Sequence, residues 1–137
     1  MNDIDQEQAR RVWQRVRGGE ATLGEIIELE WKNYGALENL ARRATGERSA
    51  GMIRMSRVSR SHWAILRGIR ALTTGKREPP EGKKECSQPL VNSYTRARQC
   101  QEFYGARRND PDFGEIFRYL WQESIEQCRS LLELMGQ

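Results

Sequence analysis

The chain has 137 residues, of which 37% are hydrophobic and 31% charged, with a formal net charge of +4 at pH 7. This length supports one compact domain with a hydrophobic core and is too short for two. The N-terminal stretch MNDIDQEQ is polar, and no run approaches the roughly 18 uncharged apolar residues of a membrane span. We therefore expect no signal peptide, no membrane association and a cytoplasmic location.

Three cysteines without a C-x-x-C pair argue against a disulfide framework, a zinc ribbon or a rubredoxin-type iron site.

Helical signals follow one another along the chain. Residues 1–21 are predicted to form a short amphipathic helix on the apolar positions Ala9, Val12, Trp13 and Val16. The capping box TLGE at residues 22–25 predicts the start of a long helix that runs to Gly46.

A second long helix is predicted over roughly residues 50–74, closed by Gly75. The charged, proline-containing stretch KREPPEGKKECSQ then forms a connection, and Pro89 suits the first turn of a third helix. Asp110 and Pro111 are predicted to cap and begin a fourth helix that runs to about Met135. The sequence therefore predicts an all-α protein in which residues 22–137 form an antiparallel four-helix bundle.

Each long helix carries apolar residues at alternating spacings of three and four, the pattern of a buried bundle seam. Polar residues interrupt all four seams near mid-helix, so they converge on one interior layer if the helices are aligned. The predicted members of this polar layer are Glu30, Ser59, His62, Gln101, Tyr104, Ser124 and Gln127.

The sequence also repeats itself weakly. The stretch LARRATGERSAGMIRMSRVSRSHWAIL matches GARRNDPDFGEIFRYLWQESIEQCRSLL at an offset of about 65 residues, which places Ser59 and His62 on Ser124 and Gln127. A duplicated helix pair, with one inward position on its first helix and an i, i+3 pair on its second, resembles the ferritin-like superfamily. The resemblance is to rubrerythrin-like proteins in particular and covers residues 22–136.

The resemblance implies a site for two iron or manganese ions, held by a glutamate on the first helix of each half and a Glu-x-x-His on the second. Only Glu30 and His62 match this pattern here. The remaining ligand positions carry Ser59, Ala97, Ser124 and Gln127. Glu30 alone would leave about three positive charges of two divalent ions without compensation. We therefore expect no dimetal centre and no cofactor, with a single iron, manganese or zinc ion at Glu30 and His62 as the alternative.

Three functions follow from this interpretation. The favoured one is a non-catalytic binding or assembly protein, without catalytic residues, in which Glu30 and His62 belong to a hydrogen-bonded network that fixes helix register. The first alternative is a rubrerythrin-type peroxidase, oxidase or iron-handling protein with a mononuclear site, although the chain lacks a rubredoxin module.

The second alternative uses the basic character of the second long helix. Residues 48–77 contain arginines and lysines but no acidic residue, and the predicted anion-binding face consists of Arg54, Arg57, Arg60, Arg67 and Arg70. Acidic residues on the first and fourth helices offer ion pairs within the bundle or across a two-fold dimer. We therefore expect a homodimer, and we favour ion pairing over nucleic-acid binding because no readout motif is present.

Overall fold

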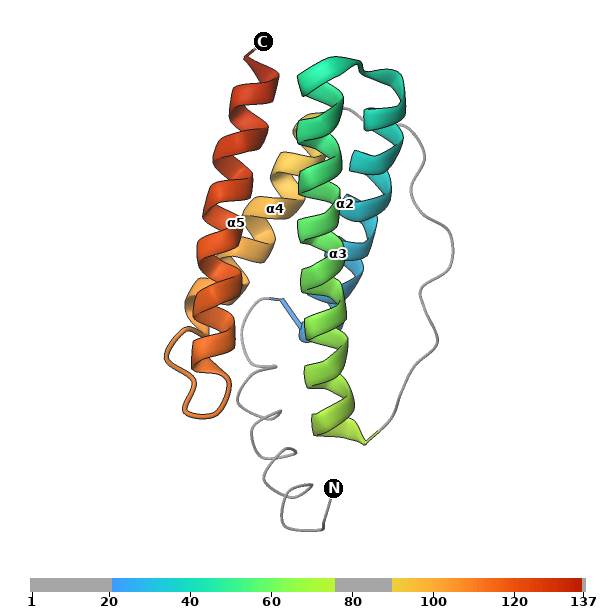
Figure 1. Ribbon diagram of the computed structural model, residues 1–137. Helices are drawn as coiled ribbons and strands as arrows, with labels where there is room; N and C mark the ends of the chain where they lie inside the picture. Colours follow the sequence, from blue (N-terminus) through green and yellow to red (C-terminus); the bar gives the residue numbers. More distant parts are fainter. Residues whose placement is uncertain (1–20, 76–89, 137) are drawn as a thin grey trace.

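The computed structural model describes residues 21–75 and 90–136, and all regular structure in them is helical (Figure 1). The helices are α2 (Leu23–Arg43), α3 (Gly46–Thr74), α4 (Leu90–Ala106) and α5 (Gly114–Met135). The predicted all-α class with four long helices is thus confirmed for these residues. The predicted N-terminal helix falls on residues 1–20, outside the described residues, and so does the connection over residues 76–89.

The start of α2 matches the predicted capping box, because the Glu25 backbone N–H donates to Thr22 Oγ1 at 3.1 Å. The helix ends at Arg43, three residues before the predicted end. Ala44 and Thr45 are extended, and Gly46, with φ of 60°, turns the chain directly into α3. A positive φ suits glycine, which has no Cβ to clash. The glycine that was expected to close one helix therefore opens the next.

Gly75 closes α3 as predicted, with φ of 73° and its N–H bonded to the Ala71 carbonyl at 2.8 Å. The prediction for α5 was wrong by one turn. Asp110 Oδ2 accepts from the backbone N–H groups of Asp112 and Phe113, at 3.1 and 2.8 Å, and so organises a separate turn. The helix itself begins at Gly114, because the aspartate satisfies the amides of that turn instead of the first helical turn.

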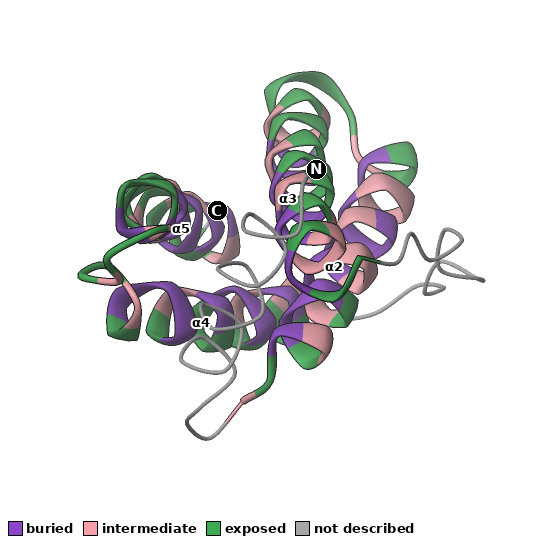
Figure 2. Cartoon of the chain, turned by 90° about the horizontal axis from the view of Figure 1, so that it is seen from below, coloured by how far each residue is buried: buried purple, intermediate pink, exposed green. Residues whose placement is uncertain are grey.

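The helices pack as two pairs, α2 with α3 and α4 with α5, and α2 also packs along α4. The contact between α3 and α5 is the least extensive of these four. Figure 2 shows the buried positions of each helix turned toward the interior. Within the described segments, no helix has both the length and the apolar character needed to cross a bilayer.

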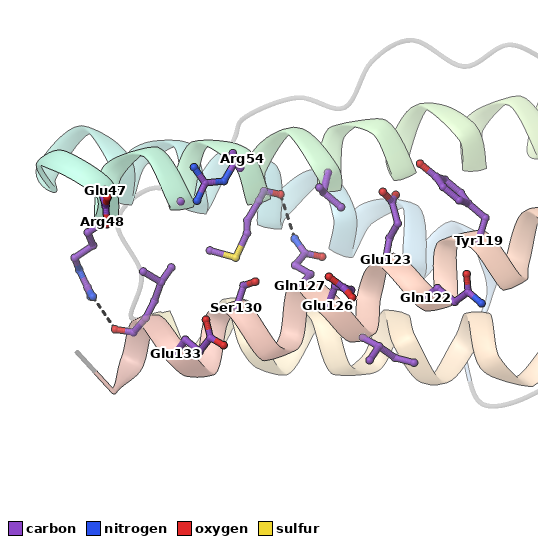
Figure 3. A pocket seen from close by; sticks show the side chains of 15 residues that line it. Glu47, Arg48, Arg54, Tyr119, Gln122, Glu123, Glu126, Gln127, Ser130 and Glu133 are labelled. Atoms are coloured by element: carbon purple, nitrogen blue, oxygen red, sulfur yellow. Dashed lines mark hydrogen bonds between the residues drawn. The ribbon is translucent and has the colours of Figure 1, made fainter.

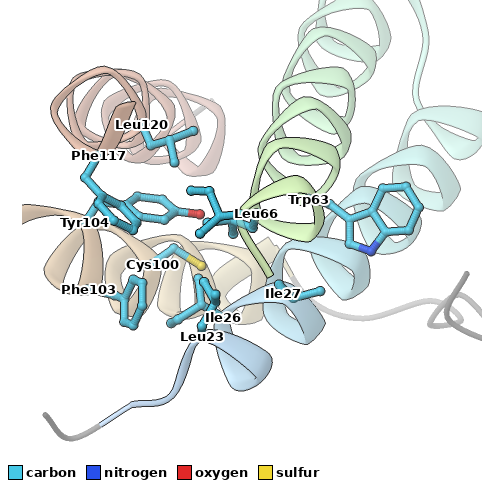
Figure 4. Packing of buried hydrophobic residues seen from close by; sticks show 11 residues of the cluster. Leu23, Ile26, Ile27, Trp63, Leu66, Cys100, Phe103, Tyr104, Phe117 and Leu120 are labelled. Carbon is cyan, nitrogen blue, oxygen red and sulfur yellow. The ribbon is translucent and has the colours of Figure 1, made fainter. Parts of the chain in front are cut away.

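The buried apolar side chains form two clusters. One gathers Leu23, Ile26, Leu66, Phe117 and Leu120 with their neighbours (Figure 4), and the other lies toward the opposite helix ends. The second cluster includes Leu37, Met52, Met55, Leu131 and Leu134. On α2 and α5 the buried polar residues fall between these two groups in the sequence, and on α3 all of them except Thr73 do. This is the mid-helix arrangement that the seam pattern predicted.

Candidate functional site

The lone histidine joins three helices. His62 lies on α3 and is fully buried, and its Nδ1 is 2.8 Å from Glu30 Oε2 on α2. Its Nε2 is 2.8 Å from Glu123 Oε1 on α5. The Glu30 side chain is 1% exposed, whereas that of Glu123 is 32% exposed. His62 is therefore held between one buried carboxylate and one that reaches solvent.

The fourth helix enters the same network through Tyr104. Its hydroxyl donates to Glu30 Oε2 at 2.6 Å, so this oxygen accepts from both Tyr104 and His62. At the solvent end, Glu123 raises the pKa of the exposed Tyr119. A continuous chain of hydrogen bonds thus runs from the partly exposed Glu123 to the fully buried Tyr104, through His62 and Glu30.

The two carboxylates determine the charge of the histidine. Burial lowers the pKa of His62, but the Glu30 and Glu123 carboxylates raise it by more, so it stands above its ordinary value of 6.5. An imidazolium donates from both ring nitrogens, which matches the two short contacts. Burial and the nearby Glu30 charge raise the pKa of Tyr104 well above its usual 10.0, which keeps its hydroxyl a donor. The core of the site is a cation between two anions.

A second connection between α3 and α5 lies one turn away. Gln127 Nε2 donates to Ser59 Oγ at 2.9 Å and to the Met55 carbonyl at 3.1 Å. Since Ser59 precedes His62 by three residues and Gln127 follows Glu123 by four, the two connections lie on successive helical turns of the same two helices. Together they hold α5 against α3, the packed helix pair with the least extensive contact of the four.

The other predicted members of the polar layer lie differently. Ser124 is buried, but its Oγ has no hydrogen-bond partner among the described residues, and the same is true of Glu30 Oε1. Gln101 is half-buried and joins none of the hydrogen bonds described above. The buried face of α4 passes instead through its neighbour Cys100, whose pKa is raised well above 9.0 by burial.

Sequence reasoning missed Glu123, which it counts only among the acidic residues of the fourth helix that offer ion pairs. A signal for it exists, because Glu123 follows Leu120 by three residues and precedes Gln127 by four, which is itself a seam spacing. A second buried polar cluster was also missed. Asn33 on α2 donates from Nδ2 to the Ser93 carbonyl on α4 at 3.1 Å and accepts from Arg96 Nη1 at 3.2 Å.

The residues present do not fit the dimetal centre that the family resemblance implies. A metal-binding imidazole needs a nitrogen free of its proton, yet both nitrogens of His62 face carboxylate oxygens. Ser59 and Gln127 are bonded to each other, neutral oxygen ligands of this kind bind iron or manganese weakly, and Ala97 offers none. Among the described residues, no group of three or more His, Cys, Asp or Glu side chains is arranged to hold a metal ion.

The predicted arginine face of α3 is divided among different surroundings. Arg60 lies over the Tyr34 ring, 5.8 Å from its centroid, and Arg67 lies 4.8 Å over the Trp63 ring. Arg57 is exposed and lines a groove beside α2, whereas Arg54 lines the larger groove beside α5. Arg70 is half-buried. These guanidinium groups therefore do not form one uniformly solvated stripe.

Comparison with known proteins adds no assignment. No protein-family model matches the chain, and neither the curated proteins nor the solved structures include a significant match. The argument for function therefore depends on the chemistry of the site.

Proposed function

We propose that this chain is a ferritin-like antiparallel bundle of the rubrerythrin type that acts as a non-catalytic binding or assembly protein. In this proposal, an ionic hydrogen-bond network replaces the dimetal centre of its relatives. The observation that carries it is the placement of His62, whose two ring nitrogens each lie 2.8 Å from a carboxylate on a different helix. A buried imidazolium there supplies the positive charge that the carboxylates need.

The network suits a structural role better than catalysis. It leaves Tyr104 and Glu30 fully buried and hydrogen-bonded to each other. The side chain at its solvent end, Glu123, is already engaged by His62. Helices tied together in this way present a rigid outer surface, which is the requirement for an assembly protein.

A metal count tests the proposal directly. The protein, purified without a histidine tag, is loaded anaerobically with ferrous iron or manganese, desalted and measured by mass spectrometry beside His62→Leu and the control Gln101→Ala. The expected result is no stoichiometric metal in any of the three proteins. About two metal ions per chain, lost in His62→Leu, would return the protein to the dimetal oxidases and peroxidases.

One observation favours a second candidate, a mononuclear metal protein. Glu30 Oε1 is buried and has no hydrogen-bond partner among the described residues, so it could accept a cation if His62 gave up one of its carboxylate contacts. One iron, manganese or zinc ion per chain, lost in both His62→Leu and Glu30→Gln, would establish this candidate. Nucleic-acid binding through the arginines of α3 stays the second alternative, which the sequence disfavours, with salt-dependent binding to a DNA duplex as its test.

A further inference from the structure

A groove with a volume of about 830 Å³ lies between α3 and α5. It follows the first half of α3 and most of α5, the two helices whose contact is the least extensive of the four packed pairs. Met55, Val58 and Leu134 supply apolar lining, while the small residues Gly51 and Ser130 leave room between the helices. The groove can therefore receive side chains from another surface.

The walls of this groove differ in charge, because α5 contributes glutamates as its only charged lining residues, whereas α3 contributes Arg48 and Arg54 together with Glu47 near its start. Figure 3 shows Glu126, Ser130 and Glu133 in a row along α5, with Arg54 on α3 across from them. Arg54 and both glutamates are exposed, and no ion pair engages them within the described residues. Arg54 on α3 and the two glutamates on α5 are thus exposed charges without an ion-pair partner among the described residues, beside the apolar lining of the groove.

A surface with an acidic wall and a basic wall is complementary to itself. A two-fold axis places the same patch of two copies face to face, so that residue i contacts residue j and j contacts i. The acidic wall of one copy then meets the basic wall of the other in both halves of the interface. An unrelated basic or acidic partner would satisfy only one of the walls.

We infer that the α3–α5 groove is a homodimer interface, in which Arg54 of each copy pairs with Glu126 of the other. The inference rests on the proposed assembly function and names its partner, a second copy of this chain. Tyr119, at one end of the groove, is 50% exposed and supplies an aromatic side chain of the type enriched in interfaces. The interface leaves the buried His62 and Glu30 side chains untouched and covers Glu123, which lines the groove.

Charge reversal tests this pairing. Sedimentation equilibrium of the full chain is expected to give twice the chain mass of 16.0 kDa. Arg54→Glu and Glu126→Arg each place like charges opposite one another twice per dimer, so self-association should weaken about ten-fold or more in each. Circular dichroism confirms that both variants remain helical. Arg57→Glu, which lies one turn along α3 but outside the groove, serves as the control and should keep the dimer mass.

Complementation decides the outcome. An equimolar mixture of Arg54→Glu and Glu126→Arg restores both pairs only in the mixed dimer, and the double variant restores them in its own dimer. Both samples should recover the dimer mass. A monomeric wild type at all concentrations, reversals that leave the mass unchanged, or a mixture that stays monomeric would each overturn the inference. Bound metal together with a persistent dimer would overturn the proposed function alone.

Discussion

An imidazolium stabilises two carboxylates best when each of its N–H groups points at one of them, as in His62. Glu30 and Glu123 lie on different helices, so this one side chain fixes the relative positions of α2, α3 and α5. Tyr104 adds α4 through the same Glu30 oxygen. A substitution of His62 should therefore affect the packing of all four helices.

Replacement of His62 by leucine keeps an apolar volume but leaves Glu30 buried without its cation. Breaking a buried ion pair by removal of one partner costs about 3–5 kcal/mol, and we expect that decrease in the free energy of unfolding by urea. The Glu123→Gln variant is the matched control, because its side chain is 32% exposed and can be hydrated; its cost should stay below about 1 kcal/mol. Equal decreases in the free energy of unfolding for the two variants would contradict the proposal that the buried Glu30 depends on the His62 cation more than His62 depends on Glu123.

The raised pKa of His62 predicts a specific pH dependence. The folded state binds the proton more tightly than the unfolded state, so the contribution of His62 is complete below about pH 6.5 and is lost as pH rises through the folded-state pKa. The difference in unfolding free energy between wild type and His62→Leu should therefore be larger at about pH 6 than at about pH 9. Because His62 is the only histidine, no other imidazole contributes. A difference that is constant with pH would refute the charged imidazolium.

At the scale of helices, the periodic pattern predicted α3 and α5 well because their buried stripes are narrow. The seam positions Met55, Ser59 and Leu66 on α3 and Phe117 and Leu131 on α5 are all buried, as the spacing indicates. On α4 the pattern predicted the buried Tyr104 but was wrong at Gln101, because this helix packs against both α2 and α5. That second contact rotates the buried face toward Cys100 and Phe103 and leaves Gln101 at its edge.

The pairing of α4 with α5 depends on a close approach at Gly105. A Cβ at this position would lie 2.8 Å from Trp121 Nε1, so the indole packs directly against the α4 backbone. We expect Gly105→Ala to displace Trp121 and to lower the free energy of unfolding by about 1–3 kcal/mol, the usual cost of overpacking. Trp121 fluorescence, compared with that of a Trp121→Phe variant, reports the displacement.

Gly68→Ala is the matched control for this prediction. Gly68 also lies inside a helix, but it is exposed and nothing lies within 4 Å of the added Cβ. Helix propensity then acts alone, and the variant should be more stable by about 0.5–1 kcal/mol. If Gly105→Ala were stabilising as well, close packing of Trp121 against α4 would be disproved.

At the scale of the whole molecule, two helix pairs are joined by polar bridges of two kinds. The bridge between α3 and α5 consists of the His62 and Gln127 contacts. The bridge between α2 and α4 passes through Asn33 and through the Tyr104–Glu30 hydrogen bond. The sequence predicted that polar residues would meet near mid-helix, because the period places them on buried faces. It could not predict which of them pair, because pairing depends on the rotation and axial offset of each helix.

Substitution of Asn33 measures how much its hydrogen bonds between α2 and α4 contribute to the free energy of unfolding. Its amide group satisfies the Ser93 carbonyl and the buried Arg96 guanidinium together, so Asn33→Ala removes both contacts where water cannot replace them. A hydrogen bond to a charged group contributes about 1.5–3 kcal/mol, and we expect a loss of that size in urea unfolding. Asn39→Ala is the control on the same helix, since Asn39 is half-buried and accepts from the exposed Arg42; its effect should stay within about 0.5 kcal/mol.

Hydrogen exchange separates a local effect from a global one in the Asn33→Ala variant. If the bridge joins the two helix pairs, amide protection should fall in both α2 and α4, while α5 keeps its protection until global unfolding. A fall confined to α2 would mean that Asn33 only stabilises its own helix. The α2–α4 contact would then depend on apolar packing and on the Tyr104–Glu30 hydrogen bond, and the Asn33 bridge would be dispensable for joining the pairs.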